Sequence, residues 1–259
     1  MRNVFAIARI VILEMYRRKE FYVLFILTII ICLIMGSINI FNDKQVVRYL
    51  KELCLLMIWV SSLIIAITTT ARQIPAEREQ RTLLPLLAKP LSRTQLIVGK
   101  FLGCWIVSGL ALVCFYAFFG ALAASREHSW PLAHYFQAAF LHWIDLGVVV
   151  ALSLLGSLVF AAPSSNSTIC FAIVAAILCL GRYLDQFALN AHGLARSIIY
   201  GIYFAIPHLE MPFGMRNLIV HDWPINDWKF VWLLCLYLLA YVAFFLVAAC
   251  LVFRRKAVN

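Results

Sequence analysis

Gly99 and Lys100 are the residues that could bind a nucleotide phosphate. A Walker A loop has another glycine five residues before its second glycine, and a serine or threonine directly after the lysine. Thr94 and Phe101 occupy these two positions here. We therefore predict that the chain is not an enzyme and has no catalytic residue. If ATP drives its function, the ATP and its magnesium must be bound by a partner ATPase subunit.

Histidines and cysteines are the residues that could hold a metal ion. No two histidines lie at i and i+4, and no two cysteines form a CxxC pair. The sequence therefore predicts no metal and no cofactor bound by this chain. A metal-handling site on the outer side is the alternative, because all the histidines fall on that predicted side or at its membrane boundary: His128, His134, His142, His192, His208 and His221.

His142 and Asp145 are a further pair that could do chemistry, because residues at i and i+3 share one face of a helix. An ionisable residue in a membrane segment is a functional hypothesis by default. Asp145 is expected only a turn or two from the outer surface. We therefore favour an interfacial hydrogen bond, with a functional pair as the alternative.

Membrane helices must position these residues, because the composition is that of a membrane protein. Of 259 residues, 64% are hydrophobic and 13% are charged, and the mean hydropathy is +0.92. A span needs about 20 mainly apolar residues to cross the hydrocarbon core. We predict an all-α membrane protein of one domain, residues 1–259, with six transmembrane helices at residues 21–40, 54–70, 97–124, 138–162, 167–187 and 230–253.

Lysine and arginine in the connections determine the orientation of such a protein. With both termini in the cytoplasm, 14 of the 22 basic residues lie on the inner side. We therefore predict a multi-pass protein of the cell (inner) membrane with cytoplasmic termini. Residues 1–20 are predicted to form an amphipathic interfacial helix or an inward extension of the first span. Residues 195–206 are too few to cross and predict an interfacial or re-entrant outer segment, broken at Pro207 and Pro212.

The connection between the second and third predicted spans, residues 71–96, combines charged residues with a cluster of leucines. Exposed apolar clusters usually mark a contact surface, so a partner is expected to cover them. The alternative is that they pack on the protein's own helix ends. Ser92 and Gln95 have the spacing of a capping box, and Leu91 and Leu96 have that of a hydrophobic staple. Together they predict a stiff joint at the start of the third span.

This connection resembles the cytoplasmic-loop signature of ABC-2 type transporter permeases. The resemblance rests on ERE at 77–79, TLL at 82–84, LAKPLSR at 87–93 and GKF at 99–101, with Arg81 and Pro85 as departures. The chain most resembles the subgroup that includes multicopper-enzyme-maturation permeases. The resemblance implies that the segment docks onto a separate ATP-binding cassette ATPase subunit, through the coupling residues Glu77, Glu79, Thr82, Leu83, Leu84, Lys89, Pro90 and Arg93.

The same resemblance implies export of a substrate, driven by ATP hydrolysis in the partner. The family builds its pathway from two permease subunits, so we expect a homodimer or heterodimer in the lipid bilayer, and no nucleic acid. The alternative is an ATP-driven mechanical or assembly role, which acts on an extracytoplasmic accessory protein without substrate translocation. A lipid-modifying enzyme is disfavoured, because the sequence has no HExxH and no paired-carboxylate motif.

Overall fold

Every element in the described part of the chain is a helix. The computed structural model describes residues 2–17, 22, 26–31, 33–34, 44–79, 92–127, 132–190, 194–214, 216–221 and 223–255. No strand occurs in these ranges, as the predicted all-α class requires. In chain order the helices are α1 (Arg2–Tyr16), α3 (Lys44–Ala71), α4 (Gln73–Glu79), α6 (Arg93–Glu127), α7 (Leu132–Val159), α8 (Pro163–Asn190), α9 (Leu194–Ala205), α10 (Glu210–Gly214), α11 (Asn217–Val220) and α12 (Trp228–Arg255).

Five helical segments in the described part are long and apolar enough to cross a membrane. They cover Lys51–Glu79, Arg93–Ala124, Leu132–Val159, Pro163–Gly181 and Trp228–Arg255, and correspond to the second to sixth predicted spans. The first predicted span, residues 21–40, lies mostly outside the described residues. Its residues 26–31 are helical, and Thr28 Oγ1 lies 2.7 Å from Ser61 Oγ on α3.

Several helices extend beyond the predicted spans. Helix α3 begins at Lys44 rather than at residue 54, and α7 begins at Leu132 rather than at residue 138. Hydropathy marks only the part of a helix inside the hydrocarbon. The residues that extend α3, KQVVRYLKEL, and those that extend α7, LAHYFQ, include good helix formers such as leucine, alanine and glutamine, so each helix continues beyond its most apolar part. The predicted connection 71–96 likewise contains α4 and the start of α6. Pro75 lacks the N–H that would continue the helical hydrogen bonding, which explains the break between α3 and α4.

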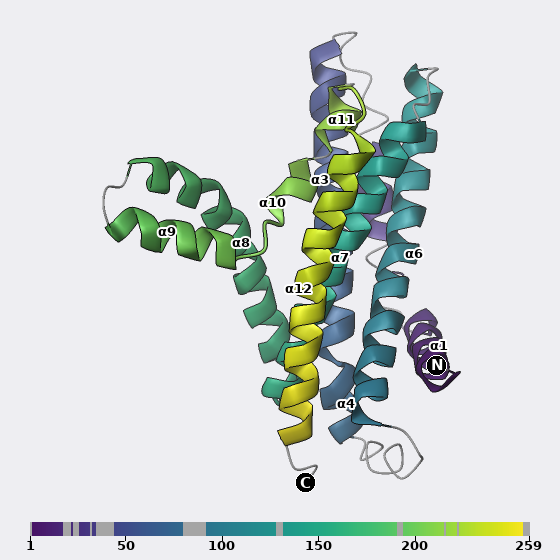
Figure 1. Cartoon of the computed structure of the whole chain (residues 1–259). Coiled ribbons are helices and arrows are strands. Elements are labelled where there is room, and N and C mark those ends of the chain that lie inside the picture. The colour runs from purple at the N-terminus through teal and green to yellow at the C-terminus, as the bar shows by residue number, and fades with distance from the viewer. Residues whose placement is uncertain are drawn as a thin grey trace.

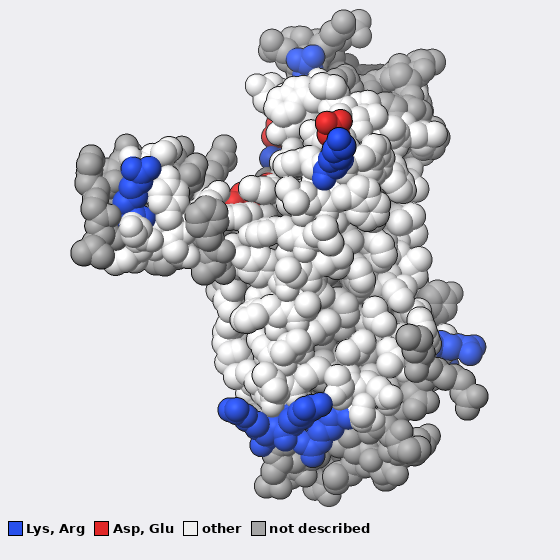
Figure 2. Space-filling model, in the orientation of Figure 1, with Lys and Arg blue, Asp and Glu red and all other residues white. Residues whose placement is uncertain are grey.

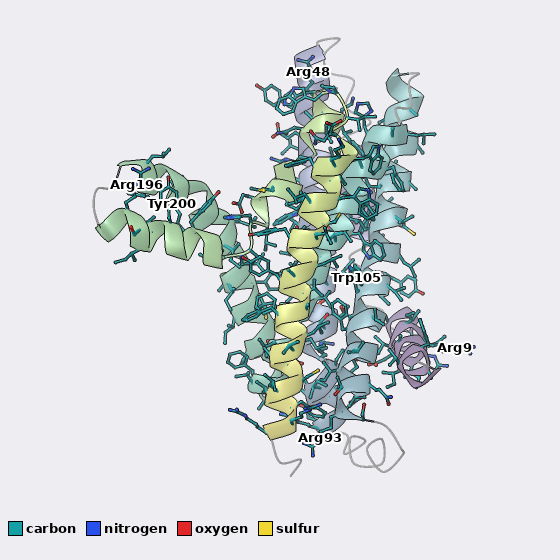
Figure 3. The ribbon with its side chains drawn as sticks, viewed as in Figure 1. Arg9, Arg48, Arg93, Trp105, Arg196 and Tyr200 are labelled. Carbon is teal, nitrogen blue, oxygen red and sulfur yellow. The ribbon has the colours of Figure 1, made fainter. Side chains whose placement is uncertain are left out.

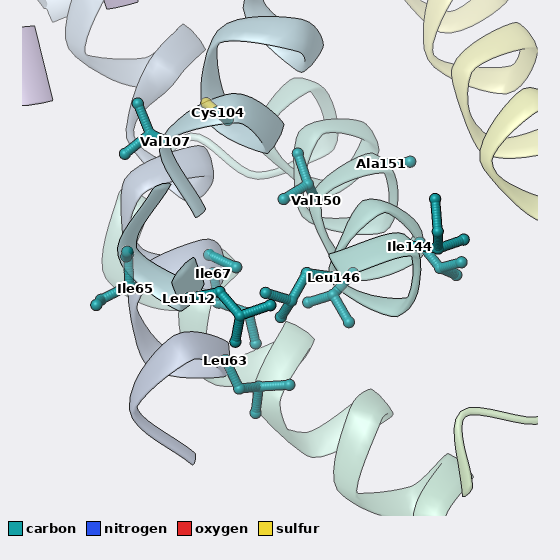
Figure 4. Close-up of a cluster of buried hydrophobic side chains, with 14 of the residues drawn as sticks. Leu63, Ile65, Ile67, Cys104, Val107, Leu112, Ile144, Leu146, Val150 and Ala151 are labelled. Carbon is teal, nitrogen blue, oxygen red and sulfur yellow. The ribbon is translucent and has the colours of Figure 1, made fainter. Parts of the chain in front are cut away.

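The core of the bundle lies around α7, which packs against α3, α6, α8 and α12 (Figure 1). Lipid is as apolar as the core side chains, so close packing rather than the hydrophobic effect holds such helices together. Helix α7 is therefore the centre against which the other helices are positioned. The apolar side chains that meet there include Leu63, Ile65, Ile67, Cys104, Val107, Leu112, Leu146 and Val150 (Figure 4).

Two tryptophans join α6 to α7 by a reciprocal contact. Trp105 Nε1 donates to the backbone carbonyl of Trp143 at 2.9 Å, and Trp143 Nε1 donates to that of Trp105 at 3.1 Å. The rings stack with their centroids 4.6 Å apart. Gly109 and Gly147 make room, because a Cβ at either position would meet the tryptophan of the opposite helix. The patterns WIVSG and WIDLG, which the sequence analysis did not single out, encode this contact.

Helix α1 lies beside α6 and runs across it (Figure 1). Ile7 and Val11 are buried against Gly99 and Gly103, where an added Cβ would lie 2.8 Å and 2.7 Å from their respective Cβ atoms. Two glycines four residues apart form a groove that admits another helix closely. Arg9 is exposed (Figure 3). Helix α1 thus has one face fixed to α6, and its interfacial location remains a prediction.

Helix α8 leaves the bundle and forms with α9 an arm that projects from it (Figure 1). Helix α9 ends at Ala205, shortly before Pro207, because a residue that precedes proline disfavours helical geometry. This break is the one that the sequence predicts. The second predicted break is wrong, because Pro212 lies in the first turn of α10, where proline is tolerated.

Between α9 and α12, side-chain contacts hold the chain against α3 and α7. Arg216 Nη2 lies 3.3 Å from Glu52 Oε1 on α3. The side-chain amide of Gln137 on α7 donates to Asn226 O at 2.9 Å and accepts from Asn226 N at 3.1 Å. These contacts position the start of α12.

Candidate coupling site

The connection that the sequence singles out joins α4 to α6 at one end of the bundle. We call this end the α4 end; it consists of α4, the first turns of α6 and the last turn of α12 (Figure 1). Glu77, Glu79 and Arg93 flank the connection and are described. The other predicted coupling residues lie outside the described residues: Thr82, Leu83, Leu84, Lys89 and Pro90.

Lys100 joins α6 to α4 from a buried position. Its ammonium donates to Glu77 Oε1 at 2.7 Å, to Gln73 Oε1 at 3.2 Å and to the Gln73 backbone carbonyl at 3.0 Å. Only 2% of Lys100 is exposed, and a cation buried so deeply requires partners of this kind. An ammonium has three N–H donors, so these contacts occupy all of them. Lys100 therefore positions a helix, and it presents no donor to a phosphate.

The two acids of α4 have different surroundings. Glu77 contacts Lys100 and is half-buried, whereas Glu79 is exposed. Residues two apart on a helix point to different sides, which accounts for the difference. A partner that docks on α4 would therefore reach Glu79 more readily than the Lys100-bound oxygen of Glu77.

The start of α6 has the capping box that the sequence predicts. Gln95 N donates to Ser92 Oγ at 3.1 Å, and Ser92 N donates to Gln95 Oε1 at 3.2 Å. These bonds satisfy two of the backbone donors that a helix start leaves without intrahelical partners. Leu96 is buried, and Leu91 lies outside the described residues, so the hydrophobic staple stays a prediction.

Arg93 joins the start of α6 to the end of α12 (Figure 3). Its Nη1 donates to the backbone carbonyls of Phe253 at 3.0 Å and Arg254 at 3.1 Å. Its guanidinium lies 5.6 Å from the centre of the Phe253 ring. The last carbonyls of a helix carry the negative end of its dipole, so a cation at this place is stabilising. Arg93 thus binds the end of α12 in its own chain, in addition to the docking role that the resemblance implies.

Basic side chains gather at the α4 end (Figure 2). Arg254 and Arg255 are exposed there, and Arg93 lies beside them. An excess of arginine and lysine is typical of the cytoplasmic side of a membrane protein. The same surface would attract an acidic patch on a partner.

The comparison with protein families decides which kind of membrane protein this is. A family model described as "ABC-2 family transporter protein" matches residues 6–258, from α1 to beyond the end of α12. The chain belongs to the ABC-2 transporter family. This result confirms the family to which the resemblance points, and the subgroup remains a prediction. No curated protein matches the chain significantly.

As a member of the ABC-2 family, the chain is a multi-pass membrane permease of an ABC transporter. Permeases of this family are membrane subunits without their own ATPase site, and membership implies a partner ATP-binding subunit. In this ABC-2 permease the α4 end is the candidate site for that partner, because α4 and the start of α6 flank the signature segment and exposed charges cluster beside them.

The sequence analysis missed the contact of Lys100 with Glu77 and Gln73. A signal for it was present, because a lysine within a predicted span needs a partner, and Glu79 and Glu77 are the nearest acids before it in the chain. The pattern could not reveal which of the two acids faces Lys100. That choice depends on how α4 is rotated after the break at Arg72.

His142 and Asp145 lie farther into their helix than the predicted span start implies, and both side chains are buried. His142 Nε2 lies 3.1 Å from Ser62 Oγ on α3, and its Nδ1 lies 3.5 Å from the hydroxyl of Tyr116 on α6. Asp145 is buried near the middle of α7, which begins before the predicted span, and its depth in the membrane stays a prediction. Asp145 Oδ1 has no hydrogen-bond partner among the described residues.

The described histidines contact different partners in different parts of the structure. His134 Nε2 lies 2.9 Å from Trp223 O, and His208 Nδ1 lies 3.0 Å from Glu210 Oε1. His128 and His192 lie outside the described residues. In the part of the chain that the structure describes, no group of three or more His, Cys, Asp or Glu residues could hold a metal ion.

Proposed function

We propose that this chain is the export permease subunit of an ABC-2 transporter in the inner membrane, and that its partner ATPase docks on residues 71–96. The observation that carries this proposal is the anchoring of both flanks of the connection. Lys100 fastens α4 to α6 on one side, and Arg93 fastens the start of α6 to the end of α12 on the other. A segment held at both ends transmits a displacement to the helices that hold it.

The proposed path of the motion follows side-chain contacts that join successive helices. A push on α4 reaches α6 through Glu77 and Lys100, and α6 passes it to α7 through Trp105 and Trp143. Two permease subunits, identical or related, form the pathway, and two ATPase subunits drive it. The rearrangement moves a substrate outward or into the outer leaflet.

The proposal includes a topology with six spans and cytoplasmic termini. Residues 21–40 form the first span, α1 lies in the inner interface, and α9 lies in the outer interface or re-enters the bilayer. The basic cluster at the α4 end supports this orientation, because positive charge is retained on the cytoplasmic side. Helix α12 ends at the same end of the bundle (Figure 1).

The docking claim is tested by changing Leu83 and Leu84 together to aspartate. Charges in an apolar contact surface should abolish co-purification of the ATPase subunit, while the permease still inserts in the membrane. Leu132→Asp is the matched control, because Leu132 is exposed at the opposite end of the bundle. If the double variant retains its ATPase subunit with normal ATP hydrolysis, residues 71–96 are not the docking site.

A further inference from the structure

The α9–α10 connection, residues 206–209, is where the arm meets α12 (Figure 1). Pro207, His208 and Leu209 are buried, although they have no helical structure. Connections usually run over the surface of a protein, because their backbone polar groups need partners. A buried connection therefore indicates contacts that fix its backbone.

Tyr237 of α12 binds the backbone on both sides of Pro207. His208 N donates to the Tyr237 hydroxyl at 3.3 Å, and this hydroxyl lies 3.3 Å from the backbone carbonyl of Ile206. The hydroxyl of Tyr241, one turn further along α12, lies 3.4 Å from that of Tyr237. Carbonyls at the end of a helix have no intrahelical partners, and a proline cannot continue the helix. One side chain of α12 thus fixes the backbone where the arm ends.

Side chains around the connection add contacts with three further helices. The His208 ring faces the rings of Tyr203 on α9 and Tyr237 on α12, at centroid distances of 4.2 Å and 6.0 Å. His208 Nδ1 lies 3.0 Å from Oε1 of Glu210, the first residue of α10. The Glu210 carboxylate lies against α8 at Gly181, where an added Cβ would be 2.8 Å from it. The base of the arm is therefore packed on α12 through one compact set of contacts.

Helix α12 continues from these contacts to the α4 end (Figure 1). It runs over Trp228–Arg255 without proline or glycine, the residues at which sharp kinks most often occur. Near its last turn, Arg93 of α6 donates to the carbonyls of Phe253 and Arg254. The same helix therefore contacts α6 at the α4 end and the base of the arm through Tyr237.

We propose that α12 carries the ATP-driven motion of the α4 end to the arm, with Tyr237 as the positioning residue that attaches the arm. The inference rests on the proposed function, which supplies the motion, and it adds a second path to the one through α6 and α7. Distant sites are coupled through hydrogen bonds, packed side chains and rigid elements. A displacement of α12 moves Tyr237, and the contacts on both sides of Pro207 make the arm follow.

An environment-sensitive fluorescent amino acid in place of Ser197, an exposed residue of α9, tests the proposal in the assembled transporter in lipid nanodiscs. Trapping of the ATPase subunits with ATP, magnesium and vanadate should change its emission. Tyr237→Phe, which keeps the ring and removes the hydroxyl, should still bind and trap the ATPase subunits but lose most of this change. Tyr183→Phe is the matched control, because Tyr183 is an exposed tyrosine of the arm, and it should keep the change.

Two failures can be told apart. If no ATPase subunit binds the native permease, the proposed function is wrong and this inference with it. If the native transporter traps its ATPase subunits and the emission does not change, or changes equally in Tyr237→Phe, this inference alone is wrong.

His208→Gln keeps the proposal testable if Tyr237→Phe does not fold. This variant removes the ring that faces Tyr203 and Tyr237 but keeps the backbone N–H that donates to the Tyr237 hydroxyl. It should lose part of the emission change and still trap the ATPase subunits. A change as large as that of the native transporter would overturn the proposal.

Discussion

Two buried ionisable side chains in this permease have opposite surroundings. At the α4 end, Lys100 has three acceptors within 3.2 Å. In the middle of α7, Asp145 Oδ1 has no hydrogen-bond partner among the described residues. A cation with fixed acceptors holds two helices together, because separating them would leave it buried and uncompensated. Asp145 has no comparable contact at its Oδ1, so this oxygen does not join α7 to another described helix. The two sites therefore differ in how far the described residues compensate a buried ionisable group: contacts fix Lys100 between α4 and α6, whereas one oxygen of Asp145 has no such contact.

The largest effect is expected at the contact of Lys100 with Glu77. Glu77→Ala leaves Lys100 buried without a carboxylate and should reduce the free energy of unfolding by about 3 kcal/mol. Equilibrium unfolding in mixed detergent micelles measures the loss. Glu79→Ala is the matched control, because Glu79 is an exposed acid on the same helix and should change stability by less than about 0.5 kcal/mol.

A double variant separates the charge of Lys100 from its shape. Lys100→Met in the Glu77→Ala background removes the buried cation and keeps most of the side-chain volume, so it should recover much of the lost stability. If the double variant is no more stable than Glu77→Ala, the contact between α4 and α6 does not depend on the pairing of charges. The contrast between Lys100 and Asp145 would then be wrong.

A smaller effect is expected from Arg93→Gln. Arg93 lies at the rim of the α4 end, where solvent screens its interactions with the last carbonyls of α12. The loss in unfolding free energy should be about 0.5–1 kcal/mol, and Arg93→Lys, which keeps the charge, should lose less. A loss as large as that of Glu77→Ala would show that the exposed contact, and not Lys100, holds the α4 end together.

Much of the fold could be predicted from hydropathy, because a membrane helix must be apolar over about 20 residues. The second to sixth predicted spans have counterparts in α3, α6, α7, α8 and α12. The capping box at Ser92 and Gln95 was predictable because all its atoms lie within one helical turn. Helix ends were less predictable, since polar residues extend a helix beyond the hydrocarbon.

Contacts between helices could not be predicted in the same way. The pairs Lys100 with Glu77 and Trp105 with Trp143 depend on how each helix is rotated about its axis, and hydropathy does not fix that rotation. The burial of Asp145 was missed for a related reason, because its place within the helix follows from where α7 begins. Of the predicted coupling residues, Thr82 to Pro90 lie outside the described residues, and their role remains a prediction.

Photo-crosslinking in the assembled transporter tests the docking claim most directly. A photo-reactive amino acid in place of Glu79 would stand on the exposed side of α4, and one in place of Leu132 would stand at the opposite end of the bundle. We predict a crosslink to the ATPase subunit from position 79 and none from position 132. A complex that remains intact but gives no crosslink from position 79, or equal crosslinks from both positions, would contradict the account.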